Sequence, residues 1–245
     1  MGLLLLYLNL CWADSVASRW APVIHQEMGS EPRADEFTRV DYDGDWNAKN
    51  NWEHLTKSPR PASVYYAVIE SEQFYFITYA LFFPRDYASI CFWMHCHEND
   101  FEGLRVTVKK PATLWRLETL AHNRLNVLEQ PKKIEIMVER EGHGIYAKAA
   151  SAPFKTYEPQ DYELIPLDEL WQRRKSDLFR GEFVYQGRKL PANFNGDDWI
   201  VWGLGAAKPP WAWEMWGTDW EKGEWFLHPL KGVKEHYLHH PYLRD

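Results

Sequence analysis

Apolar and polar residues alternate in several short segments of this chain, which is the pattern of β-strands with one buried face. The alternation is clear at 101–109, where the even-numbered positions from 104 onward are aliphatic. The segment 73–83 is apolar on both faces and predicts a central strand covered on both sides. Further strands are predicted at 63–69, 113–121 and 132–139. With 245 residues available, the pattern predicts an all-β fold, a single antiparallel β-sandwich with a few covering helices over residues 19–245.

Two carboxylates near the start of the alternating segment point to its apolar face. Asp100 and Glu102 share the parity of Leu104 and Val106, so a strand directs all four side chains toward the core. Ionised carboxylates on such a face are costly unless a cation or several donors receive them. His97, three residues before Asp100, can approach the same point. The pattern predicts a divalent cation, and oxygen-rich ligands favour Mg²⁺, Ca²⁺ or Mn²⁺ over Zn²⁺.

The segment 76–102, FITYALFFPRDYASICFWMHCHENDFE, also resembles the necrosis-and-ethylene-inducing (NPP1-like) proteins. In that family an aromatic strand ends in Phe-Pro-Lys-Asp and is followed by Gly-His-Arg-His-Asp-Trp-Glu. This chain has Phe-Pro-Arg-Asp at 83–86 and Cys-His-Glu-Asn-Asp-Phe-Glu at 96–102. The resemblance implies an NPP1-like sandwich and a divalent metal ion held by Asp86, His97, Asp100 and Glu102.

Two further histidines are candidates for proton transfer or for ligand contact. The NPP1-like family has another His downstream of its Glu, and the resemblance implies that His122 takes this place. His143 lies between Gly142 and Gly144, which lets the backbone approach a ligand or take a positive φ. Histidine also tolerates a positive φ in ordinary turns, so a purely structural role for His143 stays open.

The charge balance argues against a nucleic-acid partner. The formal net charge is −7 and the pI is about 5.8, and the Lys and Arg residues are scattered along the chain. The chain is rich in aromatic residues, with 14 Trp, 13 Tyr and 12 Phe. Such residues are typical of sheet cores, and contacts with sugars or a membrane interface are the alternative.

The first residues, MGLLLLYLNLCWADSVAS, form a short apolar run that ends in small residues, as in a secretory signal peptide. Residues 1–18 are therefore predicted to be a signal peptide, cut before Asp14 or before Arg19, and the protein is predicted to be secreted or periplasmic. No Lys or Arg precedes Arg19, which leaves a buried N-terminal segment as the alternative. The run is shorter than the about 20 residues that span a bilayer, so no transmembrane segment is predicted.

The cysteines leave their redox state open. If Cys11 leaves with a signal peptide, Cys91 and Cys96 remain as a pair, either as two thiols or as a disulfide that stiffens the loop before His97. A zinc site that combines this pair with His95 and His97 is a weaker alternative, because the spacing matches no familiar zinc motif.

Outside the predicted strands, the region 19–53 is expected to be mostly loop. Its segment 41–53, DYDGDWNAKNNWE, does not fit an EF-hand, so turns are predicted there, with a calcium site shared with other loops as the alternative. The segment 167–175, LDELWQRRK, predicts an amphipathic helix. The Trp-dense region from Asp197 onward predicts a cap over the sandwich, with a sugar- or lipid-binding ridge at Trp211 and Trp213 as the alternative.

Three functions fit these patterns. The first is a secreted metal-binding protein that resembles the necrosis-inducing proteins and binds a polar head group or a glycan, at a membrane surface. The second is a metal-dependent hydrolase, in which the cation activates water and His122 or His143 moves a proton. The third is a metal-independent glycan-binding module that uses the Trp cluster. The chain has no nucleophile elbow, P-loop or zincin motif, and the sequence leaves the choice between enzyme and binding protein open.

Overall fold

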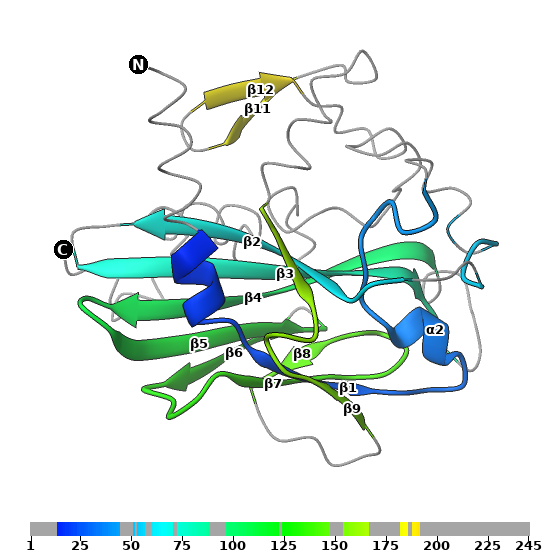
Figure 1. The fold of residues 1–245 in the computed structure, drawn as a ribbon, viewed down its shortest axis with the longest axis horizontal. Helices are drawn as coiled ribbons and strands as arrows, with labels where there is room; N and C mark the ends of the chain where they lie inside the picture. The colour runs from blue at the N-terminus through cyan, green and yellow to red at the C-terminus, as the bar shows by residue number, and fades with distance from the viewer. Residues whose placement is uncertain are drawn as a thin grey trace.

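Two β-sheets packed face to face form the fold, with short helical segments beside them (Figure 1). The computed structural model describes residues 14–44, 51, 53–56, 60–70, 73–88, 97–122, 124–147, 154–166, 182–185 and 188–191. Strands predominate in these ranges, so the predicted all-β sandwich is confirmed.

The larger sheet has six strands in the order β10-β2-β3-β4-β5-β6. Its strands are β2 Ser63–Glu70, β3 Phe74–Asp86, β4 His97–Lys109, β5 Thr113–Ala121, β6 Arg124–Glu129 and β10 Glu163–Pro166. Strands β2 to β6 pair antiparallel with their neighbours, as strands joined by short connections do. Strand β10 lies parallel to β2 at the edge of the sheet.

The smaller sheet has the order β8-β7-β1-β9. Its strands are β1 Val23–Glu27, β7 Glu135–Val138, β8 Ile145–Tyr146 and β9 Phe154–Tyr157. The short helix α2, Pro32–Asp35, follows β1 and lies at one end of the sandwich (Figure 1). Strands β11 Glu182–Tyr185 and β12 Arg188–Pro191 form a separate two-stranded sheet.

Apolar side chains between the two sheets form the main core. Leu104 and Val106 of β4 are fully buried there, together with Ile24 of β1 and Val138 of β7. Burial of one such aliphatic side chain stabilises the fold by about 1.5–3 kcal/mol relative to exposure. Because side chains alternate along β4, Asp100 and Glu102 lie on this inner face as well, as predicted.

The predicted strands agree with β2 to β5, and β3 is buried on both faces along most of its length. The strand predicted at 132–139 is shorter, since β7 has four residues. The region 19–53, predicted as mostly loop, contains β1. Strand β1 pairs parallel with β7, and β10 pairs parallel with β2, so the sandwich is not purely antiparallel. Alternation within one strand carries no information on the direction of its neighbour.

Residues 14–19 form a helical segment that packs on the larger sheet. Ala17 is fully buried in the core, and the hydroxyl of Tyr79 donates a hydrogen bond to its carbonyl oxygen at 2.7 Å. The hydroxyl of Tyr66 contacts the carboxylate of Asp14. The signal peptide itself stays a prediction, and residues 1–13 lie outside the described residues.

Several predicted features also lie outside the described residues. These are Cys91 and Cys96, the helix at 167–175, and Trp211 and Trp213. The turn predicted from residue 41 is confirmed at 41–44, where the N–H of Gly44 donates to the carbonyl oxygen of Asp41 at 3.0 Å. No helix in the described ranges is long and apolar enough to cross a membrane.

Candidate functional site

The candidate site lies at the end of the larger sheet where β3 ends and β4 begins. The strand register places Asp86 opposite His97 and Phe83 opposite Asp100. Directly opposed residues of an antiparallel pair point to the same face, so Asp100 lies on the inner face beside Phe83. Glu102 is two residues further along β4 and shares this face. Strand pairing therefore brings the four predicted metal ligands to one end of the sheet.

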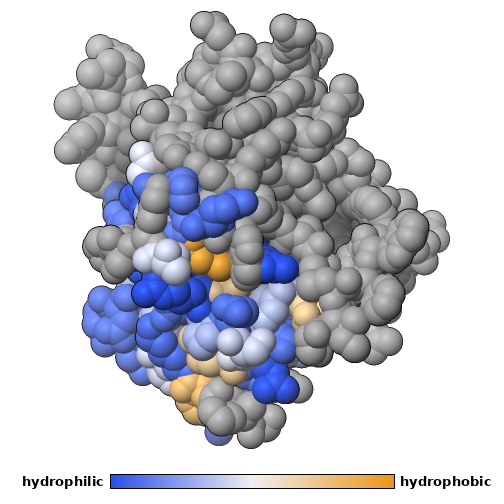
Figure 2. Space-filling model, turned by 90° about the vertical axis from the view of Figure 1, so that its right-hand side faces the viewer, coloured by the Kyte–Doolittle hydropathy of each residue, from blue (hydrophilic) through white to orange (hydrophobic). Residues whose placement is uncertain are grey.

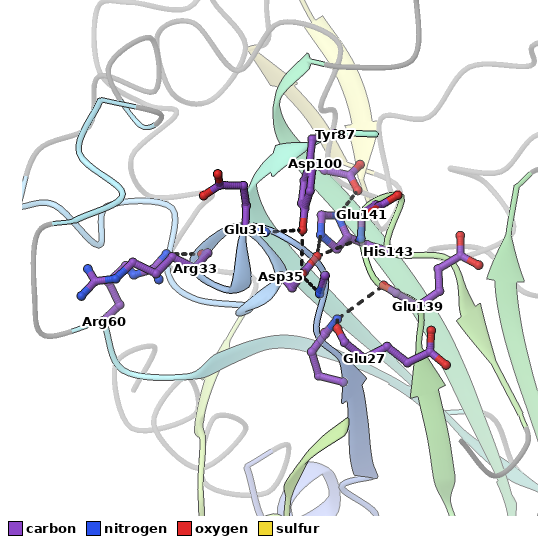
Figure 3. A network of polar contacts seen from close by, with 12 residues as sticks. Glu27, Glu31, Arg33, Asp35, Arg60, Tyr87, Asp100, Glu139, Glu141 and His143 are labelled. Carbon is purple, nitrogen blue, oxygen red and sulfur yellow. Dashed lines mark hydrogen bonds and ion pairs between the residues drawn. The ribbon is translucent and has the colours of Figure 1, made fainter. Parts of the chain in front are cut away.

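Asp35, the last residue of α2, reaches this end of the sheet from the N-terminal part of the chain (Figure 3). Its fully buried carboxylate accepts hydrogen bonds from the backbone N–H of Gly29 at 2.6 Å, the backbone N–H of Glu141 at 2.8 Å and the hydroxyl of Tyr87 at 2.9 Å. These donors satisfy the buried carboxylate. They also tie the segment before α2, the exit of β3 and the turn 141–144 together.

His143 places its imidazole between Asp35 and Asp100 (Figure 3). Nδ1 lies 3.1 Å from Oδ2 of Asp100, and Nε2 lies 3.5 Å from Oδ1 of Asp35. The shorter contact is a hydrogen bond, whereas the longer one has the distance of an ion pair. The ring stacks on Phe83 with the two centroids 3.9 Å apart. His143 is fully buried, and its φ of 53° is the positive φ that the flanking glycines indicated.

The two carboxylates decide the ionisation of His143. Burial alone lowers the pKa of an imidazole, but the hydrogen bonds and charges of Asp100 and Asp35 outweigh it and raise the pKa of His143 to about 9. At neutral pH the ring is therefore an imidazolium, whose Nδ1–H donates to Asp100 and whose Nε2 forms an ion pair with Asp35. One cation faces two carboxylates, so the buried cluster carries a formal surplus of negative charge.

A glycine is needed where the chain passes Tyr87. A Cβ at Gly29 would lie 2.6 Å from the hydroxyl oxygen of Tyr87, which is too close for any side chain. That hydroxyl oxygen also accepts the backbone N–H of Glu31 at 3.1 Å. Burial raises the pKa of Tyr87 well above its usual value, so the phenol keeps its proton and donates it to Asp35.

His122 lies at the surface. Its Nε2 contacts one carboxylate oxygen of Glu139, whose other oxygen accepts a hydrogen bond from Tyr146 at 3.0 Å. The His122 side chain is 62% exposed. Its ring also lies close to Gly142, where an added Cβ would be 3.3 Å away. Of the two histidines predicted to handle protons, His143 contacts Asp100 and His122 contacts Glu139.

The predicted metal ligands are only partly described, since the side chain of His97 lies outside the described residues. Within the described ranges, no group of three or more His, Cys, Asp and Glu residues is arranged to hold a metal ion. Asp86 and Glu102 are half-buried and have polar contacts of their own. Carboxylates from two strands and a surplus negative charge fit the chemistry of a hard divalent cation. The set Asp86, His97, Asp100 and Glu102 stays a prediction.

The sequence patterns did not point to Asp35 or Tyr87. Asp35 is far upstream of Asp100, in a region expected to be mostly loop, and no motif links the two. Its only local signal is Pro32 at the start of a short helix, a position that proline favours. Tyr87 directly follows the predicted ligand Asp86, and only this position in the sequence links it to the candidate site.

The described surface at this end of the sandwich is mainly hydrophilic (Figure 2). Figure 2 views the molecule from the side on which α2 lies in Figure 1, and blue predominates among the coloured atoms, with few orange patches. A hydrophilic surface of this kind suits a polar ligand.

Comparisons with known proteins find similarity only among solved structures. No protein-family model matches the chain, and no curated protein sequence matches it. A structure described as a toxin fold for microbial attack and plant defense shares 16% identity at a TM-score of 0.47, over 66% of this chain and 80% of that chain. The protein NLPPya in complex with glucosamine shares 15% identity at a TM-score of 0.45, over 67% and 80% of the two chains.

A further match is Necrosis and Ethylene inducing Protein 2 from the causal agent of cocoa's Witches Broom disease. It shares 13% identity at a TM-score of 0.45, over 64% of this chain and 78% of that chain. This protein bears the name of the family which residues 76–102 resemble. At such identities and TM-scores the similarity concerns the arrangement of strands and says nothing about the ligand of this chain. Fold and site together define a two-sheet β-sandwich with a buried acidic cluster at one end.

Proposed function

We propose that this protein binds a polar head group or a glycan through a divalent cation at the Asp100 end of the larger sheet. The observation that supports the proposal most is the buried cluster in which the imidazolium of His143 faces both Asp35 and Asp100. Surplus negative charge in a buried place is costly unless further positive charge lies nearby. A hard divalent cation supplies that charge and takes oxygen atoms as its ligands.

The residues proposed to hold the cation are Asp86, His97, Asp100 and Glu102. The register supports this set in part, because Asp86 and His97 are opposed on neighbouring strands near the pair of Phe83 and Asp100. Asp86 is three residues after Phe83, so regular alternation along β3 directs it to the other face, and the set requires the irregular backbone that the φ of 61° at Asn99 shows in β4. One oxygen of Asp100 accepts the hydrogen bond from His143, and a carboxylate has a second oxygen that can bind a cation. In this arrangement His143 and Asp35 act as positioning residues, since they hold the carboxylate of Asp100 in place.

Magnesium and calcium ions keep water molecules in part of their coordination shell, and the hydroxyl or phosphate oxygens of a ligand can replace that water. The hydrophilic surface at this end of the sandwich agrees with a head group or a glycan as the ligand. Secretion and action at a membrane surface belong to the same proposal and rest on the apolar leader and on the resemblance of residues 76–102.

The hydrolase alternative has less support from the described residues. A general base must be unprotonated at the working pH. Both nitrogens of His143 face carboxylates, and its pKa is raised to about 9 by Asp100 and Asp35 in spite of burial. His122 is exposed and pairs with Glu139. Neither histidine is therefore placed as a base beside Asp100. The metal-independent alternative rests on Trp211 and Trp213, which lie outside the described residues.

The proposal is tested by binding assays with and without the cation. Chelator-treated protein is reloaded with Mg²⁺, Ca²⁺ or Mn²⁺ and offered a glycan array, and separately phosphatidylcholine vesicles that contain a glycosylated sphingolipid. At least one glycan, or the vesicles, is expected to bind only when a cation is present, and Asp100→Asn should abolish this cation-dependent binding. Asp41→Asn is the matched control, because Asp41 forms a partly buried pair with Arg39 that has no contact with His143, Asp35 or Asp100. Binding that survives the chelator in full, or a hydrolysed substrate whose turnover is lost in His143→Asn, would overturn the proposal.

A further inference from the structure

A second candidate site is a cavity beside α2, built from residues outside the cluster of Asp35, His143 and Asp100. Its volume is about 310 Å³, at the lower end of the about 300–1,000 Å³ typical of small-molecule sites. The charged and aromatic residues that line it are Glu36, Phe37, Arg60, Lys155, Tyr157 and Asp161. Figure 3 shows Arg60 and His143 on opposite sides of α2. The cavity is therefore distinct from the proposed cation site.

The charged groups of this cavity already have partners. Glu36 accepts hydrogen bonds from both cations, with Nη2 of Arg60 at 3.2 Å and Nζ of Lys155 at 2.7 Å. The side chain of Arg60 is only 4% exposed and also donates to the carbonyl oxygen of Arg33 at 2.6 Å. With the carboxylate of Asp161, the lining holds two cations and two anions. The cavity is thus formally neutral but rich in donors and acceptors.

This pairing favours an uncharged ligand. An anion would have to compete with Glu36 for Arg60 and Lys155, and it would meet the negative charge of Asp161. A hydroxylated molecule can accept a hydrogen bond from Lys155 and donate to a carboxylate while both ion pairs persist. The side chain of Lys155 is half exposed and lines the cavity, so it can reach a ligand there.

The aromatic residues of the cavity offer a ligand little apolar surface, because Phe37 is 1% and Tyr157 5% exposed. Their rings lie 4.7 Å apart within the core. Ala62 contributes only a methyl group to the lining and so leaves room for a ligand. A ligand in the cavity would therefore be held mainly by polar contacts with the charged side chains.

We infer that this cavity binds a neutral, hydroxylated molecule of monosaccharide size without a metal ion. The inference does not depend on the proposed cation site. Because Asp35 and Glu36 are neighbours in the chain, a sugar in the cavity lies at the same end of the sandwich as Asp100.

The test uses the full chain in chelator, so that cation-dependent binding is absent. Glucose, galactose, mannose and inositol are titrated by calorimetry and by saturation-transfer NMR, with glucuronate as the anionic probe. At least one neutral sugar is expected to bind saturably, and more tightly than glucuronate. Lys155→Met should weaken this binding about tenfold through loss of a charged donor. Ala62→Leu, which fills the cavity, should abolish it.

Lys133→Met is the matched control, because Lys133 forms an exposed pair with Glu135 outside the cavity. This variant should bind the neutral sugar as the wild type does. The inference is overturned if metal-free protein binds no neutral sugar, if glucuronate binds more tightly, or if folded Lys155→Met and Ala62→Leu proteins both bind unchanged. These results are independent of the cation proposal. That proposal concerns only binding that a chelator abolishes, whereas this test is carried out in chelator throughout.

Discussion

Two buried charge networks of the larger sheet differ in their net formal charge. On the face turned away from the smaller sheet, Arg105 of β4 and Glu118 of β5 are both fully buried, with Nη2 and Oε2 2.9 Å apart. At the end of the sheet, His143 lies between Asp35 and Asp100. The first network balances a permanent cation with one carboxylate. The second sets a titratable cation against two carboxylates.

The difference separates a structural pair from a candidate binding site. In the buried pair Arg105–Glu118 the two charges balance each other, so its main effect is expected in the free energy of unfolding. The cluster around His143 has two carboxylates and one imidazolium, so its excess negative charge can attract a further cation. The imidazolium of His143 can also lose its proton. Changes in this cluster are therefore expected to alter pH dependence and cation binding as well as stability.

The largest effect is expected when the balanced pair is broken. Arg105→Met leaves Glu118 as a buried carboxylate without its main partner, and the free energy of unfolding should fall by about 3–5 kcal/mol. Urea denaturation measures this loss. The double variant Arg105→Met, Glu118→Leu should regain most of it, because no unpaired charge remains buried. If the double variant is as unstable as the single one, the pair is not the self-contained unit described above.

The cluster at the sheet end should make stability depend on pH in the alkaline range. The pKa of His143 is about 9 in the folded state, above its ordinary value of about 6.5, so its stabilising contribution is complete below about pH 6.5 and is lost as the pH rises through about 9. The loss should be about 3 kcal/mol at most. Urea denaturation across this range should give a flatter curve for His143→Asn, since asparagine tolerates the positive φ. Equal slopes in both proteins would contradict the assignment.

A somewhat smaller effect is expected at Asp35. Asp35→Asn keeps the shape of the side chain but removes the negative charge that faces His143. The amide NH2 group of asparagine would also face at least one hydrogen-bond donor, because both oxygens of Asp35 accept bonds from Gly29, Glu141 or Tyr87. The free energy of unfolding should fall by about 2 kcal/mol, and the pKa of His143, followed by NMR, should fall. Asp41→Asn should cost about 1 kcal/mol or less, because it breaks a single partly buried pair with Arg39. Similar losses in both variants would remove the distinction between a fully buried carboxylate with several donors and a partly buried pair.

The smallest effect is expected at His122. Its side chain is 62% exposed and pairs with Glu139, and such pairs contribute about 0–1 kcal/mol. His122→Ala should therefore change neither the melting temperature nor cation affinity to a marked degree. Loss of cation binding in this variant would show instead that His122 belongs to the site, as the resemblance of the sequence implies.

Local patterns predicted the parts of the fold that depend on one strand at a time. The alternation after residue 100 located β4 and the face of Asp100, and the continuous apolar run located β3 as a strand buried on both faces. Strand β1 was missed because its five residues carry little pattern, and its partners β7 and β9 are more than a hundred residues away.

The candidate site was predicted in part for the same physical reason. Asp100 could be found because it lies on the strand that the pattern revealed, and His143 because glycines flank it. Their contact, and the role of Asp35 between them, depend on tertiary packing of three distant segments. No spacing in the sequence encodes that packing.

Calorimetric titration of chelator-treated protein with Mg²⁺, Ca²⁺ and Mn²⁺ tests the contrast between the two networks most directly. The wild type and the double variant Arg105→Met, Glu118→Leu should each bind one equivalent of at least one of these ions, because the outer pair takes no part in the site. Asp100→Asn should bind none. Absence of binding in the wild type, or an undiminished equivalent in Asp100→Asn, would contradict the claim that the acidic cluster at the end of the sheet receives a divalent cation.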